Sequence, residues 1–178
     1  MKKQTQLSLF SRTKESIKVQ LAHGGSLRQG KRKIARPFDH KRALHIVLRA
    51  EKAKGEWSLL NPKHQFKIRA MIVSFSRLYG ISVYELSVNG NQVHLLIRAK
   101  TRKAFQSFLR RLTGAISMLV TGAKKGNPVG RFLEQLAFSR VVSWGREYKV
   151  VFQYVKLNLV EGLTGAYRDD LVWVNLKV

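Results

Sequence analysis

The chain has 178 residues, and its 34 Lys and Arg side chains against 10 Asp and Glu give a formal net charge of +24 at pH 7, a balance that favours a polyanionic partner. A hydrophobic content of 44% allows a buried core and excludes a wholly disordered basic tail, and the absence of cysteine excludes disulfides, thiolate metal sites and a cysteine nucleophile. No apolar run approaches the roughly 18 residues of a membrane span, and the N-terminus lacks the apolar stretch of a signal peptide, so we expect a cytoplasmic protein without a membrane partner.

Residues 1–41 are expected to form a basic, flexible arm ahead of a single domain at 42–178. Up to Arg36 the segment has ten Lys and Arg side chains and one acid, Glu15. Its densest basic run is Lys31, Arg32 and Lys33. Such a run can contact phosphates, because each neutralised phosphate releases condensed counterions. A solvated tail that binds nothing is the alternative.

From Arg42 onward the hydrophobic pattern is that of alternating strands and helices. Leu44, Ile46 and Leu48 recur with the period of two that is typical of a strand. Asn89-Gly90 is the strongest short signal for a hairpin turn, and Thr101 is a good N-cap for a helix. The predicted elements are, in order, a strand at 44–50, a helix at 62–80, strands at 81–88 and 92–99, a helix at 102–122, a strand at 137–144, a helix at 145–163 and an edge strand at 171–178.

This order of elements predicts an α+β fold of the ferredoxin-like, split βαβ type. In that arrangement four antiparallel strands form one sheet, with the first and third predicted strands side by side at its centre. The two crossover helices cover one face of the sheet. The other face is expected to be open to a ligand, and the extra C-terminal helix follows the last strand of the sheet.

Side-chain parity places a group of polar residues on the expected open face. Gln92, His94 and Arg98 point away from the crossover helices, because successive side chains of a strand alternate between the two faces. His45 and Arg49 share that face on the first strand. The spacing of Gln92 and His94 would present two ligands to one divalent cation and leave positions open for phosphate. The alternative is a half-buried imidazole with a hydrogen-bonded neighbour.

Three segments resemble the single-tyrosine HUH transposases, especially their REP-associated, IS200-like branch. They are Leu44-His45-Ile46-Val47-Leu48-Arg49, Ser87 to Ile97 (S-V-N-G-N-Q-V-H-L-L-I, similar to N-H-V-H-L-L) and Tyr154 to Leu163 (Y-V-K-L-N-L-V-E-G-L, similar to Y-I-x-x-N-P-x-x-x-G-L). In that family two histidines hold a divalent ion on a phosphate of single-stranded DNA, and a tyrosine attacks that phosphate. The resemblance implies a transposase-like enzyme that cleaves and rejoins hairpin DNA through a 5′-phosphotyrosine intermediate, with His94 as a metal ligand and Tyr154 as the nucleophile.

The chain departs from the family pattern at Gln92, where the family has its first histidine, and at Leu159, where proline is usual. A glutamine amide oxygen is a neutral hard ligand that suits Mg²⁺ or Mn²⁺, and His45 is a candidate compensating ligand. Two outcomes stay open: a tyrosine transposase that acts as a DNA endonuclease and ligase, or a degenerate or domesticated relative that binds without cutting. A phenol of pKa near 10 is a poor nucleophile without a metal, and a core tyrosine is the alternative for Tyr154.

Nucleic-acid contacts are predicted at basic and aromatic side chains. Tyr84 and Trp144 are candidates for stacking on unpaired bases, although Trp144 could equally anchor the core. An RNA-binding module of the RRM type has the same strand order and charge, but it does not account for Gln92, His94 and a helical tyrosine together. The resemblance leaves monomer and homodimer open. The predicted phosphate-binding side chains of the domain are Arg49, Arg98, Arg102, Lys103, Arg110 and Arg111.

Overall fold

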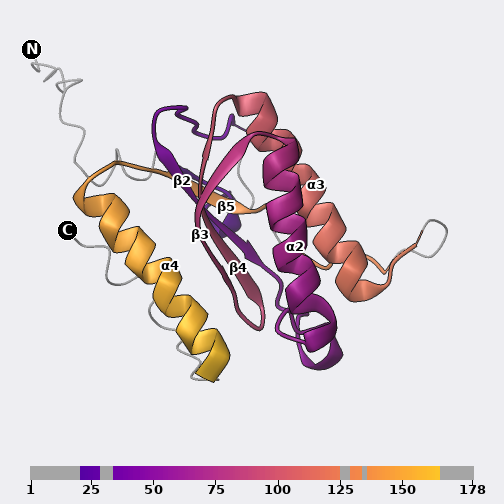
Figure 1. Cartoon of the computed structure of the whole chain (residues 1–178). Helices are drawn as coiled ribbons and strands as arrows, with labels where there is room; N and C mark the ends of the chain where they lie inside the picture. Colours follow the sequence, from indigo (N-terminus) through magenta and orange to yellow (C-terminus); the bar gives the residue numbers. More distant parts are fainter. Residues whose placement is uncertain (1–20, 29–33, 125–128, 134–135, 165–178) are drawn as a thin grey trace, which may run out of the picture.

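The computed structural model of the chain describes residues 21–28, 34–124, 129–133 and 136–164 (Figure 1). The basic run at Lys31, Arg32 and Lys33 lies outside these residues, and so does the strand predicted at 171–178. The described residues form a mixed α/β fold with one antiparallel sheet, as the sequence predicts.

The sheet has five strands in the order β1-β5-β2-β4-β3, and each neighbouring pair is antiparallel. The prediction of four strands is therefore wrong. The additional strand, β1, pairs Ala22 with Arg140 at the edge of the sheet, inside the segment predicted as a basic arm. Two residues are too few to show a hydrophobic period, so this strand is not visible in the sequence. The strands are β1 (Ala22–His23), β2 (Ala43–Arg49), β3 (Ile81–Val88), β4 (Gln92–Ala99) and β5 (Phe138–Val142).

The helices begin and end where local sequence signals place them. The Asn61 side chain accepts a hydrogen bond from the N–H of Lys63, and the Thr101 side chain accepts one from Ala104. Gly122 ends the second of these helices with a left-handed φ of 67°, which glycine adopts without strain. None of the described helices is both long and apolar enough to span a lipid bilayer. The helices are η1 (Gly25–Arg28), η2 (Gly55–Trp57), α2 (Pro62–Leu78), α3 (Arg102–Thr121) and α4 (Arg146–Thr164).

Both faces of the sheet are covered by helices. α2 and α3 pack on one face, where the main core includes Leu95, Phe105 and Leu112 (Figure 1). α4 lies against the opposite face, where Val151 and Val155 pack with Leu96 in a second core. The expectation of an open second face is therefore wrong. Val151 and Val155 lie one turn apart on α4, so they form an apolar stripe that is buried only if the helix docks on the sheet.

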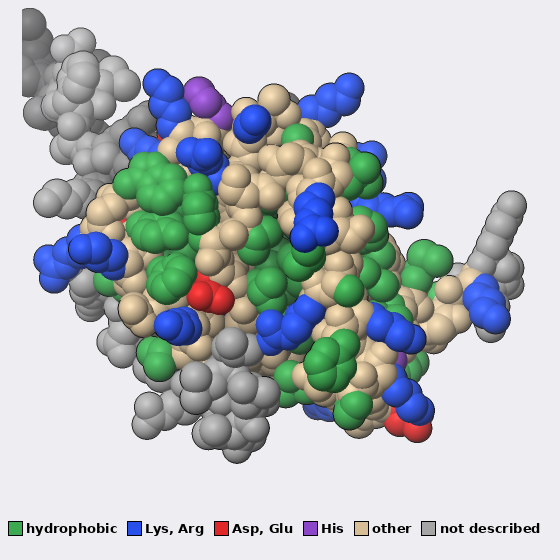
Figure 2. All heavy atoms as spheres, in the orientation of Figure 1, with side chains coloured by type: hydrophobic (Ala, Val, Ile, Leu, Met, Phe, Trp, Pro, Cys, Tyr) green, Lys and Arg blue, Asp and Glu red, His purple; other side chains and the backbone are tan. Residues whose placement is uncertain are grey.

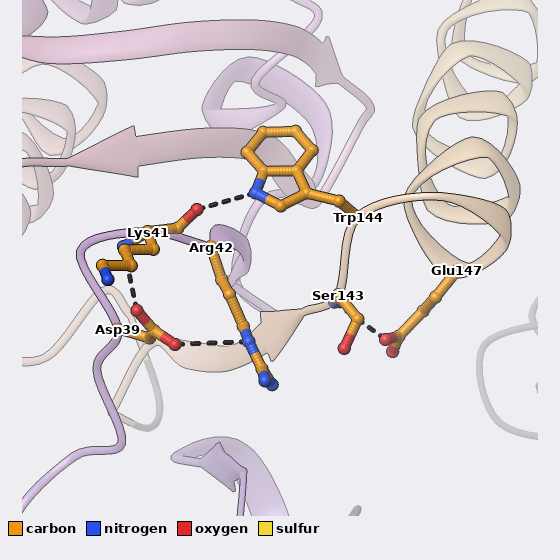
Figure 3. Close-up of polar contacts among 6 residues, drawn as sticks. All are labelled: Asp39, Lys41, Arg42, Ser143, Trp144 and Glu147. Atoms are coloured by element: carbon orange, nitrogen blue, oxygen red, sulfur yellow. Dashed lines mark hydrogen bonds and ion pairs between the residues drawn. The ribbon is translucent and has the colours of Figure 1, made fainter.

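The turn between β5 and α4 is fixed by Glu147, in the first turn of the helix. One of its carboxylate oxygens accepts a hydrogen bond from the N–H of Ser143 at 2.8 Å (Figure 3). The other pairs with Arg140 of β5 at 3.0 Å. A carboxylate at a helix N-terminus is also stabilised by the helix dipole. These contacts tie the start of α4 to the sheet and so determine which part of the helix covers the polar residues of β2 and β4.

Candidate functional site

Two histidines meet on the face of the sheet that α4 covers. β2 and β4 are neighbours, with Val47 opposite His94 and His45 opposite Leu96. His45 and His94 therefore lie diagonally across adjacent strands, on the same face. Their rings are stacked, with centroids 5.8 Å apart and planes 17° from parallel. The parity argument from the sequence places both side chains on the correct face.

Tyr154 of α4 lies over these two rings. Its ring centroid is 5.6 Å from that of His94 and 5.9 Å from that of His45, and both contacts are edge-to-face. The buried Val151 and Val155 flank Tyr154 in sequence and hold this part of α4 against the sheet. The structure thus gathers Gln92, His94, His45 and Tyr154 into one group, which we call the histidine–tyrosine cluster.

The cluster is buried rather than exposed, contrary to the expectation from the sequence. His94 is 0% exposed, His45 6% and Gln92 8%, because α4 covers them. Burial lowers the pKa of His94 to about 4. Burial also lowers the pKa of His45 well below its usual value, and the charges of His94 and Arg140 lower it further. Both imidazoles are therefore neutral at pH 7, which is the form that binds metal ions.

Hydrogen bonding in the cluster is incomplete. His94 Nε2 donates to the amide oxygen of Gln92 at 3.0 Å. Nδ1 of His94 and Nε2 of His45 are buried and have no hydrogen-bond partner among the described residues. A buried polar atom without a partner costs about 1–3 kcal/mol. Each imidazole of the cluster therefore has one buried nitrogen whose hydrogen-bonding capacity is not filled by the described residues.

The cluster offers two imidazole nitrogens and one amide oxygen that could together hold a divalent cation. With its proton on Nδ1, His94 would present a lone pair at Nε2, 3.0 Å from the Gln92 oxygen. Adjacent ligands of an octahedral ion, each about 2.1 Å from it, lie about 3 Å apart. His45 supplies a further imidazole on the same face. No group of three His, Asp or Glu side chains suited to a metal occurs within the described ranges, so a metal site here needs the Gln92 amide.

Asn158 links α4 to the hairpin that carries Gln92. It lies one turn after Tyr154, and its side chain donates a hydrogen bond to the Tyr154 carbonyl at 2.8 Å. Its amide oxygen contacts the amide nitrogen of Asn89 at 3.3 Å. Asn89 begins the hairpin turn, where its N–H donates to the carbonyl of Gln92 at 2.8 Å. The predicted hairpin is confirmed, and its turn helps to place Tyr154 over the cluster.

Arg140 is a member of the site that the sequence analysis missed. It lies opposite His45 on β5, and its Nη1 pairs with Glu147 at 3.0 Å. Its Nε and Nη2 are buried without a hydrogen-bond partner among the described residues. Burial lowers its pKa, and the charge of Glu147 opposes that shift. The alternation of side chains between the two sheet faces along residues 138–142 could have placed Arg140 on the same face as His45 and His94.

The comparisons with known proteins assign the family. Residues 40–157 match the family model described as "Transposase IS200 like". The chain belongs to the IS200-like transposase family. The family resemblance in its sequence is confirmed by this match, which covers β2 through most of α4. No curated protein matches the chain.

Two solved structures described as transposases align with this chain. A REP-associated tyrosine transposase bound to a REP hairpin aligns with a TM-score of 0.53 and 12% identity over 73% of each chain. A protein from Deinococcus radiodurans R1, described provisionally as a transposase, aligns with a TM-score of 0.43 and 16% identity over 71% of this chain and 98% of the other. The first of these similarities shows a common fold.

The predicted phosphate-binding residues of this IS200-like transposase lie on two sides of the molecule. Arg49 and Arg98 belong to the strands that α4 covers, and Arg49 forms an ion pair with Glu51 at 3.7 Å. The other four are exposed on α3, on the opposite face of the sheet: Arg102, Lys103, Arg110 and Arg111. Arg102 also donates to the Arg36 carbonyl. The structure therefore does not bring the six side chains onto one surface.

Acid is expected to destabilise the folded chain through His94. The pKa of His94 is about 4 in the folded chain and about 6.5 when exposed, so the unfolded state takes up a proton first as the pH falls. The contribution to stability is full above about pH 6.5 and is lost towards pH 4. Between pH 7.5 and 5 we expect His94 alone to lower the free energy of unfolding, measured with urea in EDTA, by about 2 kcal/mol, and the buried His45, whose pKa is also lowered, to add to this decrease.

The matched variants separate His94 from other titrating groups. In His94→Asn the decrease is expected to be smaller by the part due to His94, while the part due to the buried His45 remains. Replacement of the exposed His40 by asparagine should leave the decrease unchanged. An equal decrease in wild type and His94→Asn would contradict the assignment of the effect to this buried imidazole.

Proposed function

We propose that the chain binds single-stranded DNA folded into a hairpin, and cleaves and rejoins it through a covalent 5′-phosphotyrosine at Tyr154 with a divalent metal. The observation that carries the proposal is the position of Tyr154, whose ring centroid lies 5.6 Å from that of His94 and 5.9 Å from that of His45. The family match and the net charge of +24 support DNA as the partner. The REP hairpin bound by the structural neighbour favours hairpin DNA.

In the proposed reaction the phenolic oxygen of Tyr154 attacks the scissile phosphorus. A bond from this oxygen to phosphorus forms, and the bond to the 3′-oxygen of the preceding nucleotide breaks. The phenolic proton passes to water, and the departing 3′-oxygen takes up a proton from water to become a hydroxyl. Attack by a 3′-hydroxyl reverses these changes and rejoins the strand. Mg²⁺ or Mn²⁺ held by His94, Gln92 and His45 would withdraw negative charge from the phosphate and from the departing oxygen.

Arg140 is suited to bind the same phosphate. Its Nε and Nη2 are unpartnered among the described residues, and it lies across the strand pair from His45. A guanidinium in this position can donate two parallel hydrogen bonds to phosphate oxygens. Arg140 would orient the phosphate through Nε and Nη2, while Glu147 holds its Nη1.

The buried state of the cluster means that DNA must displace part of α4. His94 is 0% exposed, so a phosphate reaches it only if the helix shifts away from the sheet. The cluster is nevertheless complete within one chain, because Tyr154 lies beside His94 of the same chain. The proposal therefore requires no second subunit, although a homodimer is compatible with it.

The test is formation of a protein–DNA adduct that survives denaturing electrophoresis. Hairpin oligonucleotides taken from inverted repeats beside the coding sequence are labelled at the 3′ end, because a 5′-phosphotyrosine retains the downstream fragment. Wild-type protein with Mg²⁺ or Mn²⁺ should form the adduct, and Tyr154→Phe should form none while it still binds the hairpin. Tyr79→Phe, at the end of α2 on the other side of the sheet, is the control that should react normally.

A chain that binds DNA without cutting it is the second candidate, and Gln92 at a ligand position is the observation that favours it. Binding of the hairpin with no adduct in either metal would support this candidate over cleavage. A third possibility, an RRM-like RNA-binding module, is separated from these two DNA-binding candidates by measuring the affinity for single-stranded DNA and for RNA of the same sequence over a range of salt concentrations. A strong preference for RNA would contradict the proposal for DNA.

A further inference from the structure

Aromatic side chains gather where β5 passes into α4. Trp144, Tyr148 and Phe152 follow one another at intervals of four residues, with ring centroids 4.9 Å and 6.1 Å apart. Tyr84 of β3 lies 5.6 Å from Trp144 and 5.7 Å from Tyr148. We call these four residues the aromatic ladder. At the upper left of Figure 2, hydrophobic side chains gather over the end of α4 that follows β5, with Lys and Arg side chains beside them.

Trp144 is both exposed and held in place. It is 46% exposed, while Tyr84 and Tyr148 pack against it. Its indole N–H donates a hydrogen bond to the carbonyl of Lys41 at 2.6 Å (Figure 3). Lys41 is braced in turn, because its N–H donates to the Asp39 carboxylate at 2.8 Å. A ring fixed in this way loses little conformational entropy when a ligand stacks on its free face.

The charges around Trp144 favour a nucleic acid over an apolar protein segment. Arg146 and Lys149 are exposed and close to Trp144 in sequence, and the exposed Lys41 is held beside it by the hydrogen bond to its carbonyl. Arg42, next to Lys41, is ion-paired with Asp39 (Figure 3). Aromatic faces flanked by cations bind bases through stacking and the adjoining phosphates through charge. Glu85 acts on Tyr148, whose pKa is raised by burial, by Tyr84 and by this carboxylate. A phosphate is therefore expected on the Lys41 and Arg146 side of the ladder.

The spacing of the rings limits how a base can bind. Stacked aromatic layers are about 3.4 Å apart, so a base inserted between two rings needs their planes about 7 Å apart. Trp144 and Tyr148 are only 4.9 Å apart between centroids, and Tyr84 is 5.6 Å from Trp144. No base fits between these rings. The outer face of Trp144 is the position left for stacking.

We propose that the outer face of Trp144 is a stacking site for one unpaired DNA base in the strand whose phosphate reaches Tyr154. The identity of this strand rests on the proposed function. Tyr154 lies eight residues after Arg146, the first residue of α4, which at 1.5 Å per helical residue is about 12 Å, and Trp144 lies two residues before the helix. At about 3.4 Å per stacked nucleotide this distance corresponds to about four nucleotides. The stacked base lies within that distance of the scissile phosphate.

The first test measures affinity for a fluorescein-labelled dT12 strand, in EDTA and with Tyr154→Phe as the parent protein so that no cleavage occurs. Trp144→Ala should weaken binding by about 10- to 100-fold. Trp144→Phe keeps an aromatic face and should retain most of the affinity. Phe66→Ala is the matched control, since Phe66 is a 70% exposed aromatic on α2 and should not affect binding. Thermal unfolding verifies that each variant is folded.

A scan with abasic sites locates the stacked base. In the parent protein, one abasic position within about four nucleotides of the scissile phosphate of the hairpin should weaken binding, and Trp144→Ala should be insensitive to that position. Unchanged dT12 binding by Trp144→Ala would overturn the inference, and so would a Phe variant as weak as the alanine variant. Because the dT12 measurement needs no cleavage, a failure to form the adduct would count against the proposed function and leave the stacking site standing.

Discussion

Replacing His94 with alanine is expected to reduce adduct formation at least about a hundredfold, while binding of the hairpin persists. The ring centroid of His94 lies 5.6 Å from that of Tyr154, and its Nε2 lies 3.0 Å from the amide oxygen of Gln92. Loss of this imidazole therefore removes a proposed metal ligand beside the nucleophile. Removal of one group that stabilises developing charge in an acyl-transfer site costs about 10²–10³ in rate, and we expect a similar loss here. The measurement is the initial rate of adduct formation in Mn²⁺.

The matched control for this variant is another buried histidine. His64 is 9% exposed, and its Nε2 is bonded to the Glu56 carbonyl at 3.0 Å, on the side of the sheet away from α4. His64→Ala creates a comparable cavity without touching the histidine–tyrosine cluster. A normal rate in His94→Ala, or an equal loss in both variants, would contradict the role given to His94.

Replacing Gln92 with histidine is expected to raise the affinity for Mn²⁺ at least about tenfold. Gln92 already directs its amide oxygen to Nε2 of His94, so a second imidazole there would face the same point. Substitution of a residue that supports a metal ligand changes the metal affinity by about 10–100-fold, and replacement of the ligand itself should change the affinity by a similar factor. Calorimetric titration of Mn²⁺ into wild type and Gln92→His measures the difference.

The rate of adduct formation gives an independent measure of the same substitution. At Mn²⁺ concentrations that do not saturate the wild type, Gln92→His should react faster. Gln106→His, at an exposed position of α3 on the other side of the sheet, is the control that adds a histidine away from the cluster. If affinity and rate are the same in wild type and Gln92→His, position 92 does not face the ion.

Much of the fold could be predicted because short-range signals coincide with the observed elements. Asn61, Thr101 and Gly122 mark helix ends, and the alternation on β2 and β4 places His45 and His94 on one face. The family resemblance then singled out Tyr154, whose ring the structure brings to both histidines.

The burial of the site could not be predicted from local patterns. It depends on where α4 docks, and that is decided by contacts distant in sequence, such as Asn89 with Asn158. The strand β1 was missed for the same reason, because its pairing with β5 joins Ala22 to Arg140 across most of the chain. The aromatic ladder also depends on long-range packing, which brings Tyr84 against Trp144.

The most direct test of the central claim is to identify the residue that carries the DNA. Cleavage by trypsin after Lys149 and Lys156 releases the peptide Val-Val-Phe-Gln-Tyr-Val-Lys, in which Tyr154 is the only tyrosine. After nuclease trimming of the purified adduct, tandem mass spectrometry should place a 5′-linked nucleotide on this residue. A nucleotide on any other residue, or its absence from this peptide in an adduct that does form, would contradict Tyr154 as the nucleophile.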